Sequence, residues 1–128
     1  MNFKIAEKSV SYGNAIKDKS FDFAVRIIKL YKYFRKTEAS LDPILKQLLR
    51  SGTSIGANVH EAQGAITKKD FINKLQISLK EANESEYWIG LLFKTEILKS
   101  EQFESLDKDC KELIKLLTSI LKSLKSKT

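Results

Sequence analysis

Residues 42–62 of this 128-residue chain read DPILKQLLRSGTSIGANVHEA. Asp42 and Pro43 are typical of a helix start, because a proline at the first helical position gives up no intrahelical hydrogen bond. Apolar or small residues then recur every three or four positions, which is the period of one helix face. These positions are Leu45, Leu48, Gly52, Ile55, Val59 and Ala62. The stretch predicts an amphipathic helix that ends near Gln63 and Gly64, with Gly64 just past its C-terminus.

Two glycines, Gly52 and Gly56, fall inside this predicted helix, where each costs roughly 1 kcal/mol relative to alanine. Both lie on the apolar side of the helix. We therefore expect a neighbouring helix to approach closely at these two positions. A kink or break at residues 51–53 is the alternative that the pattern leaves open.

Three further helices are predicted from the same period. The first begins at Ser20, because serine is a preferred helix cap and an apolar stripe follows it. The members of this stripe are Phe23, Ala24, Ile27, Ile28, Tyr31 and Phe34. Residues 67–70, Thr-Lys-Lys-Asp, resemble a capping box and open a helix that extends to about Ile97. The last helix begins at Ser100 and carries heptad-spaced apolar residues, which are Phe103, Leu106, Cys110, Leu113, Leu117, Ile120 and Leu124.

The connections between these helices are short, which favours antiparallel packing of consecutive helices. We predict an all-α fold, an antiparallel up-down-up-down four-helix bundle over residues 20–126, preceded by an N-terminal arm over residues 1–19. No apolar run approaches the roughly 18 residues that cross a bilayer, and the first residues lack a secretory apolar region. We expect a cytoplasmic protein with no membrane partner.

The chain has a net charge of +7, and the excess is N-terminal. Residues 1–40 carry nine basic and four acidic side chains. At helical spacing, four basic residues share one face, and an aromatic residue lies beside them. A surface of this kind can contact phosphates while the aromatic ring stacks on a base. The candidate nucleic-acid-binding residues are Arg26, Lys29, Lys32, Tyr33 and Lys36. A solvated helix face is the alternative.

The third predicted helix has a second stripe, nearly opposite its main apolar stripe. This second stripe consists of Ile77, Glu81, Glu84, Trp88 and Leu91. A helix with large apolar groups on two faces is seldom exposed on either. Because a bundle of four helices has no internal partner for the second face, the stripe predicts self-association.

The polar face of the helix over residues 42–62 carries small side chains where lysine and glutamate would be usual. The candidate subunit-interface residues on it are Arg50, Ser54, Asn58 and Glu61. Arg50 and Glu61 lie about 16 Å apart along the axis, so they cannot pair within one helix. Glu81 and Glu84 are the expected partners of Arg50. An ordinary exposed face and a ligand site are the alternatives.

Glu86 falls inside the main apolar stripe of the third helix. A buried carboxylate requires a charged or hydrogen-bonding partner. Lys46, Arg50 or Tyr33 could supply one, and a stripe that is open at this point is the alternative.

The chemistry-bearing residues are few. One histidine, His60, excludes a His–His metal pair, and no Glu-x-x-His motif of a di-iron bundle occurs. Some small helical ribonucleases use an Arg and a His that lie four to six residues apart on one helix. Arg50 and His60 are ten residues apart and differ by about 80° around their helix, so they cannot pair in that way. Cys110 lies within an apolar stripe, which is typical of a small core residue. There is no phosphate-binding glycine loop. We predict no catalytic residue, no metal and no cofactor.

Two stretches of the sequence are distinctive. Residues 47–59 read QLLRSGTSIGANV and are followed by Glu61 and Ala62, and residues 70–88 form most of the third predicted helix. These stretches resemble the four-helix-bundle family related to the proteins encoded by intervening sequences in bacterial 23S ribosomal RNA genes. The resemblance covers roughly residues 14–122. It implies antiparallel bundles that assemble as homopentamers with a central channel, and it implies no catalytic residues. Relatives that serve diversity-generating retroelements are thought to bind nucleic acid and a reverse transcriptase.

Two functions follow from these patterns. The first is a non-enzymatic homo-oligomer, a pentameric ring, that binds RNA or DNA through repeated basic faces. The second is a scaffold or adaptor that binds a partner protein and uses its charge only for solubility.

Overall fold

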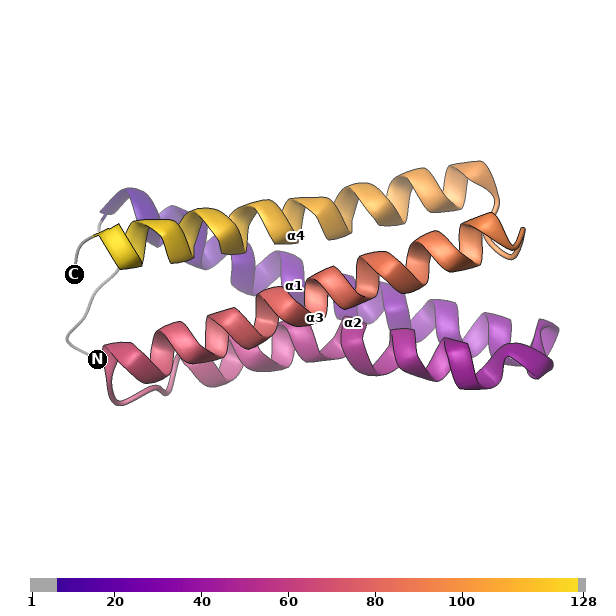
Figure 1. The fold of residues 1–128 in the computed structure, drawn as a ribbon, viewed down its shortest axis with the longest axis horizontal. Helices are drawn as coiled ribbons and strands as arrows, with labels where there is room; N and C mark the ends of the chain where they lie inside the picture. The colour runs from indigo at the N-terminus through magenta and orange to yellow at the C-terminus, as the bar shows by residue number, and fades with distance from the viewer. Residues whose placement is uncertain (1–6, 127–128) are drawn as a thin grey trace.

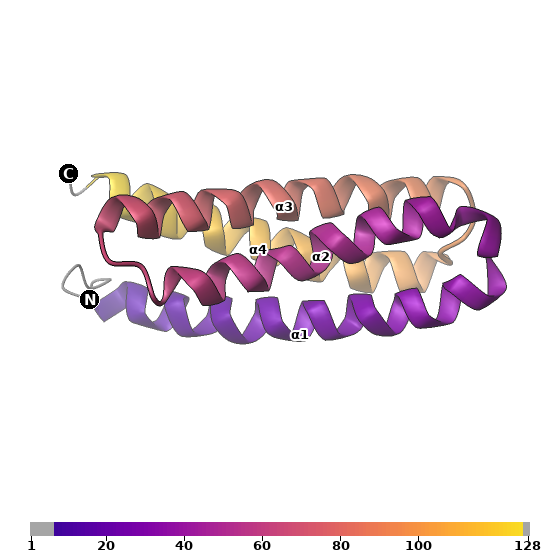
Figure 2. The ribbon, with the colours of Figure 1, turned by 90° about the horizontal axis from the view of Figure 1, so that it is seen from below.

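The computed structural model describes the backbone of residues 7–126 and the side chains of residues 14–126. Four α-helices lie side by side along one long axis (Figure 1 and Figure 2). They are α1 (Glu7–Thr37), α2 (Asp42–Ala62), α3 (Lys68–Lys94) and α4 (Ser100–Ser126), and the short 3-10 helix η1 (Ala39–Leu41) joins α1 to α2. Consecutive helices are antiparallel, and α1 packs against both α2 and α4. The predicted all-α, antiparallel four-helix bundle is confirmed.

Helix α1 begins at Glu7, so the prediction that the first helix starts at Ser20 is wrong. Ile16 and Ser20 are both buried, which shows that this helix already packs against the bundle at Ile16. The predicted arm over residues 1–19 is therefore wrong for residues 7–19, while residues 1–6 lie outside the described part of the chain. Figure 2 shows α1 running along the whole length of the bundle.

Helix α2 is continuous through both glycines, and the expected close approach of a neighbour is confirmed. A Cβ atom added at Gly52 would lie 2.8 Å from the Cγ1 atom of Ile27 on α1. A Cβ atom added at Gly56 would lie 3.1 Å from the carbonyl oxygen of Ser20. The two glycines therefore set how closely α1 and α2 pack.

Small polar residues allow α2 and α3 to pack closely in the same way. The hydroxyl oxygens of Ser51 and Ser85 are 2.9 Å apart, and both residues are fully buried. The hydroxyl of Ser78 donates a 2.8 Å hydrogen bond to the carbonyl oxygen of Ile55. Each buried hydroxyl has a partner, which avoids the cost of an unsatisfied polar group.

The helix ends follow the predictions in part. Thr67 caps α3 as expected, because its hydroxyl accepts a 3.1 Å hydrogen bond from the amide N–H of Asp70. The N-cap of α2 is Leu41 rather than Asp42. The Asp42 carboxylate instead accepts a 2.8 Å hydrogen bond from the hydroxyl of Tyr31 on α1. Helix α2 ends at Ala62 with Gln63 as its C-cap, so Gly64 lies just past the C-terminus as predicted, although its φ is not positive.

The core lies between the four helices and is built from aliphatic and aromatic side chains. Its largest fully buried members include Phe23, Ile27, Leu45, Leu48, Ile55, Phe71, Leu75, Ile89, Leu92, Leu106 and Leu113. Burial of each such side chain stabilises the fold by about 1.5–3 kcal/mol. Among the described helices, none carries an apolar stretch long enough to span a membrane.

Substitution of Gly52 by alanine should destabilise the protein although it raises helix propensity. The new methyl group would be forced against Ile27, and overpacking of this kind costs about 1–3 kcal/mol. Gly90→Ala on α3 is the matched control, because no atom of another helix lies within 4 Å of the added Cβ. We expect Gly90→Ala to stabilise the protein by up to about 1 kcal/mol. Urea denaturation at equal protein concentration measures both, and a Gly52→Ala variant as stable as Gly90→Ala would contradict the close approach.

Candidate interaction surfaces

Arg50 connects α2 to α3 through two carboxylates. Its Nη1 atom lies 2.9 Å from Oε2 of Glu81, and its Nη2 atom donates to Oε2 of Glu84. The indole N–H of Trp88 donates a 3.0 Å hydrogen bond to the same oxygen of Glu84. The predicted partners of Arg50 are therefore confirmed, and both lie in the same chain.

The hydrogen bonds of this cluster favour the charged forms of Glu84 and Arg50. The indole N–H of Trp88 and the guanidinium of Arg50 hold the pKa of Glu84 below its ordinary value, although partial burial opposes them. The hydrogen bond to Glu84 in turn raises the pKa of Arg50. A charge-assisted pair of this kind fixes the spacing of α2 and α3 on their outer side.

The remaining predicted interface residues on α2 are satisfied within the chain. The hydroxyl of Ser54 donates to the carbonyl oxygen of Arg50 at 2.6 Å, and the amide of Asn58 donates to that of Ser54 at 2.8 Å. Glu61 pairs with Lys74 of α3 at 3.2 Å. These polar groups need no second subunit to complete their hydrogen bonds.

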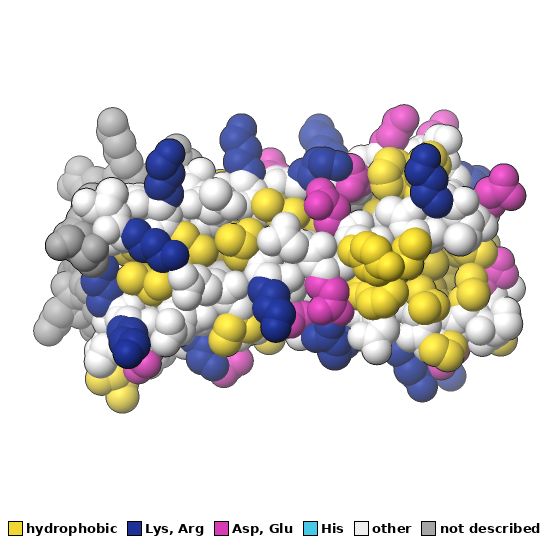
Figure 3. All heavy atoms as spheres, viewed as in Figure 1, with side chains coloured by type: hydrophobic (Ala, Val, Ile, Leu, Met, Phe, Trp, Pro, Cys, Tyr) yellow, Lys and Arg dark blue, Asp and Glu magenta, His cyan; other side chains and the backbone are white. Residues whose placement is uncertain are grey.

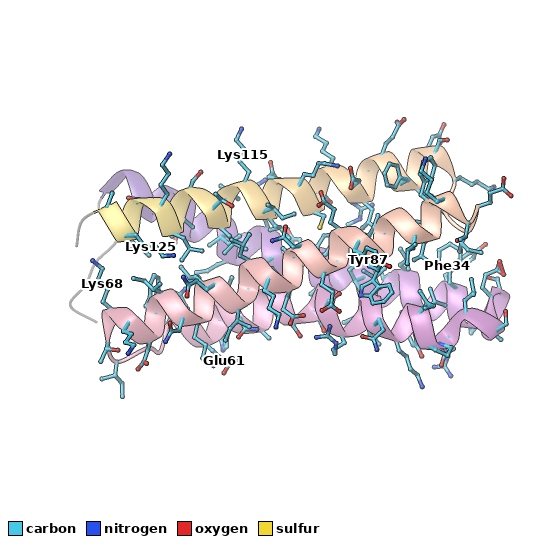
Figure 4. All side chains as sticks on the ribbon, in the orientation of Figure 1. Phe34, Glu61, Lys68, Tyr87, Lys115 and Lys125 are labelled. Atoms are coloured by element: carbon cyan, nitrogen blue, oxygen red, sulfur yellow. The ribbon has the colours of Figure 1, made fainter. Side chains whose placement is uncertain are left out.

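Apolar side chains do remain uncovered on α3. Ile77 is 42% exposed and Tyr87 is 59% exposed, while Trp88 and Leu91 are half-buried. Figure 3 shows hydrophobic side chains gathered on this side of the bundle toward the end of α3, and Figure 4 shows Tyr87 on the outer side of that helix. We call Ile77, Tyr87, Trp88 and Leu91 the α3 apolar surface.

A second uncovered apolar surface lies on α1 and was missed in the sequence. Phe21 is 68% exposed, Val25 is 37% exposed and Ile28 is 45% exposed. We call these three residues the α1 apolar surface. The sequence pattern assigned Ile28 to the core stripe, which is wrong. Positions 21, 25 and 28 are spaced as one helix face, and this spacing could have revealed the surface.

The α1 apolar surface borders a groove between α1 and α2 with a volume of about 580 Å³. Phe21 and Ala24 lie on its α1 side together with the charged Lys17 and Asp18, and residues of α2, including Gly56 and Ala57, form the other side. His60 also lines this groove, whereas Arg50 pairs with α3. The structure therefore does not bring His60 and Arg50 together.

The predicted basic face of α1 is divided by the structure. Arg26 forms a 2.5 Å ion pair with Asp109 of α4 and donates to the hydroxyl of Ser105. Lys29, Lys32 and Lys36 have no ion-pair partner within the described part of the chain. Together with Tyr33, which is 60% exposed, they line an open hollow of about 410 Å³. We call Lys29, Lys32, Tyr33 and Lys36 the α1 basic surface.

Glu86 lies where the apolar stripe of α3 is open to solvent, which was the second of the two sequence alternatives. Its side chain is 37% exposed and lies 3.6 Å from the amine of Lys111 on α4. None of Lys46, Arg50 and Tyr33 pairs with it. The residue lies at the edge of the α3–α4 contact, where a lysine can reach it and water can solvate it.

The single thiol belongs to the core. Cys110 is fully buried, and its Sγ donates to the carbonyl oxygen of Ala82 at 3.3 Å. Burial raises the pKa of this thiol to about 12, so it stays protonated at neutral pH and is a poor nucleophile. Within the described residues, no three His, Cys, Asp or Glu side chains are grouped as a metal site would require.

These features define a helical-bundle protein with three outer surfaces, two apolar and one basic. The family model for the 23S rRNA-intervening sequence protein matches residues 13–119, and the chain belongs to this family. The crystal structure of a protein with unknown function from the S23 ribosomal protein family of Bacteroides thetaiotaomicron is similar to it. The two chains are 54% identical, with a TM-score of 0.81, and the match covers 87% of this chain and 98% of the other. No curated protein matches the chain.

Replacement of Glu84 by glutamine should lower stability at pH 7 by about 1 kcal/mol, because two hydrogen bonds lose their charged acceptor. The folded-state pKa of Glu84 is lowered, so its contribution is present above the ordinary value and is lost as pH falls below it. The stability difference between wild type and Glu84→Gln should therefore shrink between about pH 5 and pH 3. Urea denaturation at each pH measures it. Glu104→Gln, at an exposed position on α4, is the control and should change stability by less than about 0.5 kcal/mol. An equal difference at pH 7 and pH 3 would argue against the role given to Glu84.

Proposed function

We propose that this protein is a non-enzymatic, homo-oligomeric ring that binds nucleic acid through the α1 basic surface of each subunit. The observation that carries the proposal is the set of three unpaired lysines around an exposed tyrosine on one side of α1. The five subunits of the ring are what the family resemblance implies.

The charge pattern of α1 supports a polyanionic partner. Between Asp22 and Glu38 the chain carries five basic residues and no acidic one. Arg26 is neutralised by Asp109, which leaves Lys29, Lys32 and Lys36 as free cations on this surface. Lysines that neutralise phosphates release condensed counterions, which is the main source of sequence-independent affinity for nucleic acid.

The positions of the two apolar surfaces support a ring. The α1 apolar surface and the α3 apolar surface belong to different helices, so a contact between them joins unlike surfaces of two subunits. Contacts of this head-to-tail kind form rings when the rotation between subunits closes. The groove beside Phe21 offers a concave partner for projecting side chains such as Ile77.

A ring would also strengthen weak binding. Three lysines in one subunit make only a modest phosphate contact, but copies held at fixed spacing act on one strand together. The assembly and the binding surface therefore belong to one function.

Replacing Lys29, Lys32 and Lys36 together by glutamine should weaken binding of a labelled 20-nucleotide single strand at least about tenfold in low salt. The slope of log affinity against log salt should fall by about two units for each subunit engaged, since each phosphate contact contributes about 0.7. Fluorescence anisotropy at several salt concentrations measures both quantities.

The matched control is the triple change Lys108→Gln, Lys115→Gln and Lys122→Gln on α4, which removes the same charge from exposed positions. Lys115 extends away from the bundle in Figure 4. An equal loss in the control would mean that net charge alone drives binding. No binding by wild type at low salt would favour the scaffold or adaptor function.

Substitution of Phe21 by aspartate should break the ring without unfolding the subunit, because Phe21 is 68% exposed and packs outside the core. Light scattering after size exclusion should give about 73 kDa for the wild type, five times 14.6 kDa, and a smaller mass for the variant. Ile66→Asp is the control, since Ile66 is 88% exposed in the α2–α3 connection. A variant of unchanged mass would exclude the α1 apolar surface from the subunit contact.

A further inference from the structure

Tyr33 lines two hollows of different character. The first is the open hollow that it lines with Lys29, Lys32 and Lys36. The second is a smaller hollow between α1 and α4, with a volume of about 270 Å³. Tyr33 and Lys29 are the residues common to both.

The smaller hollow is largely apolar. Leu30, Phe34, Leu98 and Leu106 contribute to its lining, and the last three of these are buried core residues. Its volume is just below the roughly 300–1,000 Å³ of pockets for drug-sized ligands, so it suits one ring system. This hollow can accept the flat, weakly polar face of a single aromatic group.

The polar groups at this hollow are held by the protein. Arg26 is fixed by its ion pair with Asp109, so its charge is offset there. The side-chain oxygen of Gln102 accepts a 2.9 Å hydrogen bond from the backbone N–H of Lys99. This bond orients the Gln102 side chain and leaves its NH2 group free to donate. Lys29 is therefore the one unpaired cation among the described residues that line the smaller hollow, whereas three unpaired lysines line the neighbouring hollow.

Tyr33 itself is ordered for stacking. Its ring packs edge-on against Phe34, with ring centroids 5.0 Å apart and an interplanar angle of 79°. Phe34 is buried, so it anchors the tyrosine while leaving 60% of Tyr33 exposed. A ring that is already held in place loses little conformational entropy when a ligand stacks on it.

We propose that the α1 basic surface recognises single-stranded nucleic acid, with one unpaired base stacked on Tyr33 in the hollow between α1 and α4. The neighbouring phosphates then lie against Lys29, Lys32 and Lys36. This inference rests on the proposed function. It goes beyond it because a duplex offers the same phosphates but keeps its bases stacked on one another, out of reach of Tyr33.

The test compares Tyr33→Leu with wild type on two labelled 20-nucleotide single strands, oligo(dT) and oligo(rU), and on a 20-base-pair DNA duplex. Tyr33→Leu should lower affinity for both single strands at least about fivefold, since stacking one base contributes that much or more. It should leave duplex affinity and the salt slope unchanged, because the three lysines remain. Tyr33→Phe keeps the ring and should stay within about twofold of wild type.

Ile66→Ala is the surface control. Ile66 is 88% exposed in the connection between α2 and α3 and belongs to none of the three surfaces. Its change should not affect binding of a single strand. A 2-aminopurine base in the oligo(dT) strand gives a direct readout, because its emission should fall on binding wild type and not on binding Tyr33→Leu.

Two failures are distinguishable. If wild type binds single strands and Tyr33→Leu binds them equally well, or if the duplex is bound as tightly as the single strands, base stacking is overturned while phosphate binding stands. If wild type binds none of the three nucleic acids at low salt, the proposed function fails and this inference fails with it.

Discussion

The close packing of α2 against its two neighbours is the constraint on which the other features of the bundle depend. Gly52 and Gly56 leave no room for a Cβ atom beside α1, and Ser51 and Ser85 meet across the contact with α3. Because α2 carries so little bulk at these contacts, the backbones can approach and large side chains fill the centre. The groove beside Phe21 has the same origin, since small residues on α2 form one of its walls.

That constraint explains why residues 42–62 predicted both a helix and a close neighbour of that helix. The spacing of Leu45, Leu48 and Ile55 predicts the helix, and glycines on its apolar side predict a close neighbour. The Arg50 cluster was also predictable, because a cation on a face of small residues needs acidic partners on the next helix. Glu81 and Glu84 are spaced to provide them.

The errors have equally specific causes. The start of α1 was missed because residues 7–19 are mostly polar, and Ile16 alone does not establish a period. Ser20 looks like a cap, yet it is buried because Gly56 admits its backbone. Lys111 was not foreseen as the partner of Glu86, since helical angles within α3 contain no information about which α4 side chain lies opposite. The α1 apolar surface was missed because Ile28 was counted toward the core stripe, while Phe21 and Val25 were left outside it.

One helix carries both kinds of outer surface, and their order along it has a consequence. On the outward side of α1, Phe21, Val25 and Ile28 come first, and Lys32 and Lys36 continue the same line. At 100° per residue these five positions lie within a narrow arc. If the first part of that line is covered by a neighbouring subunit, the second part is placed at the rim of the contact. Because one continuous helix carries both surfaces, the distance between neighbouring subunits then also sets the distance between their basic surfaces. No flexible linker separates the two surfaces of a subunit. Once a ligand is bound at one site, the effective concentration of the next site is highest when the distance between the sites is fixed and matches the span of the ligand. In the proposed ring, the three lysines and one tyrosine of each subunit would bind weakly alone, and the assembled copies would together hold a flexible single strand.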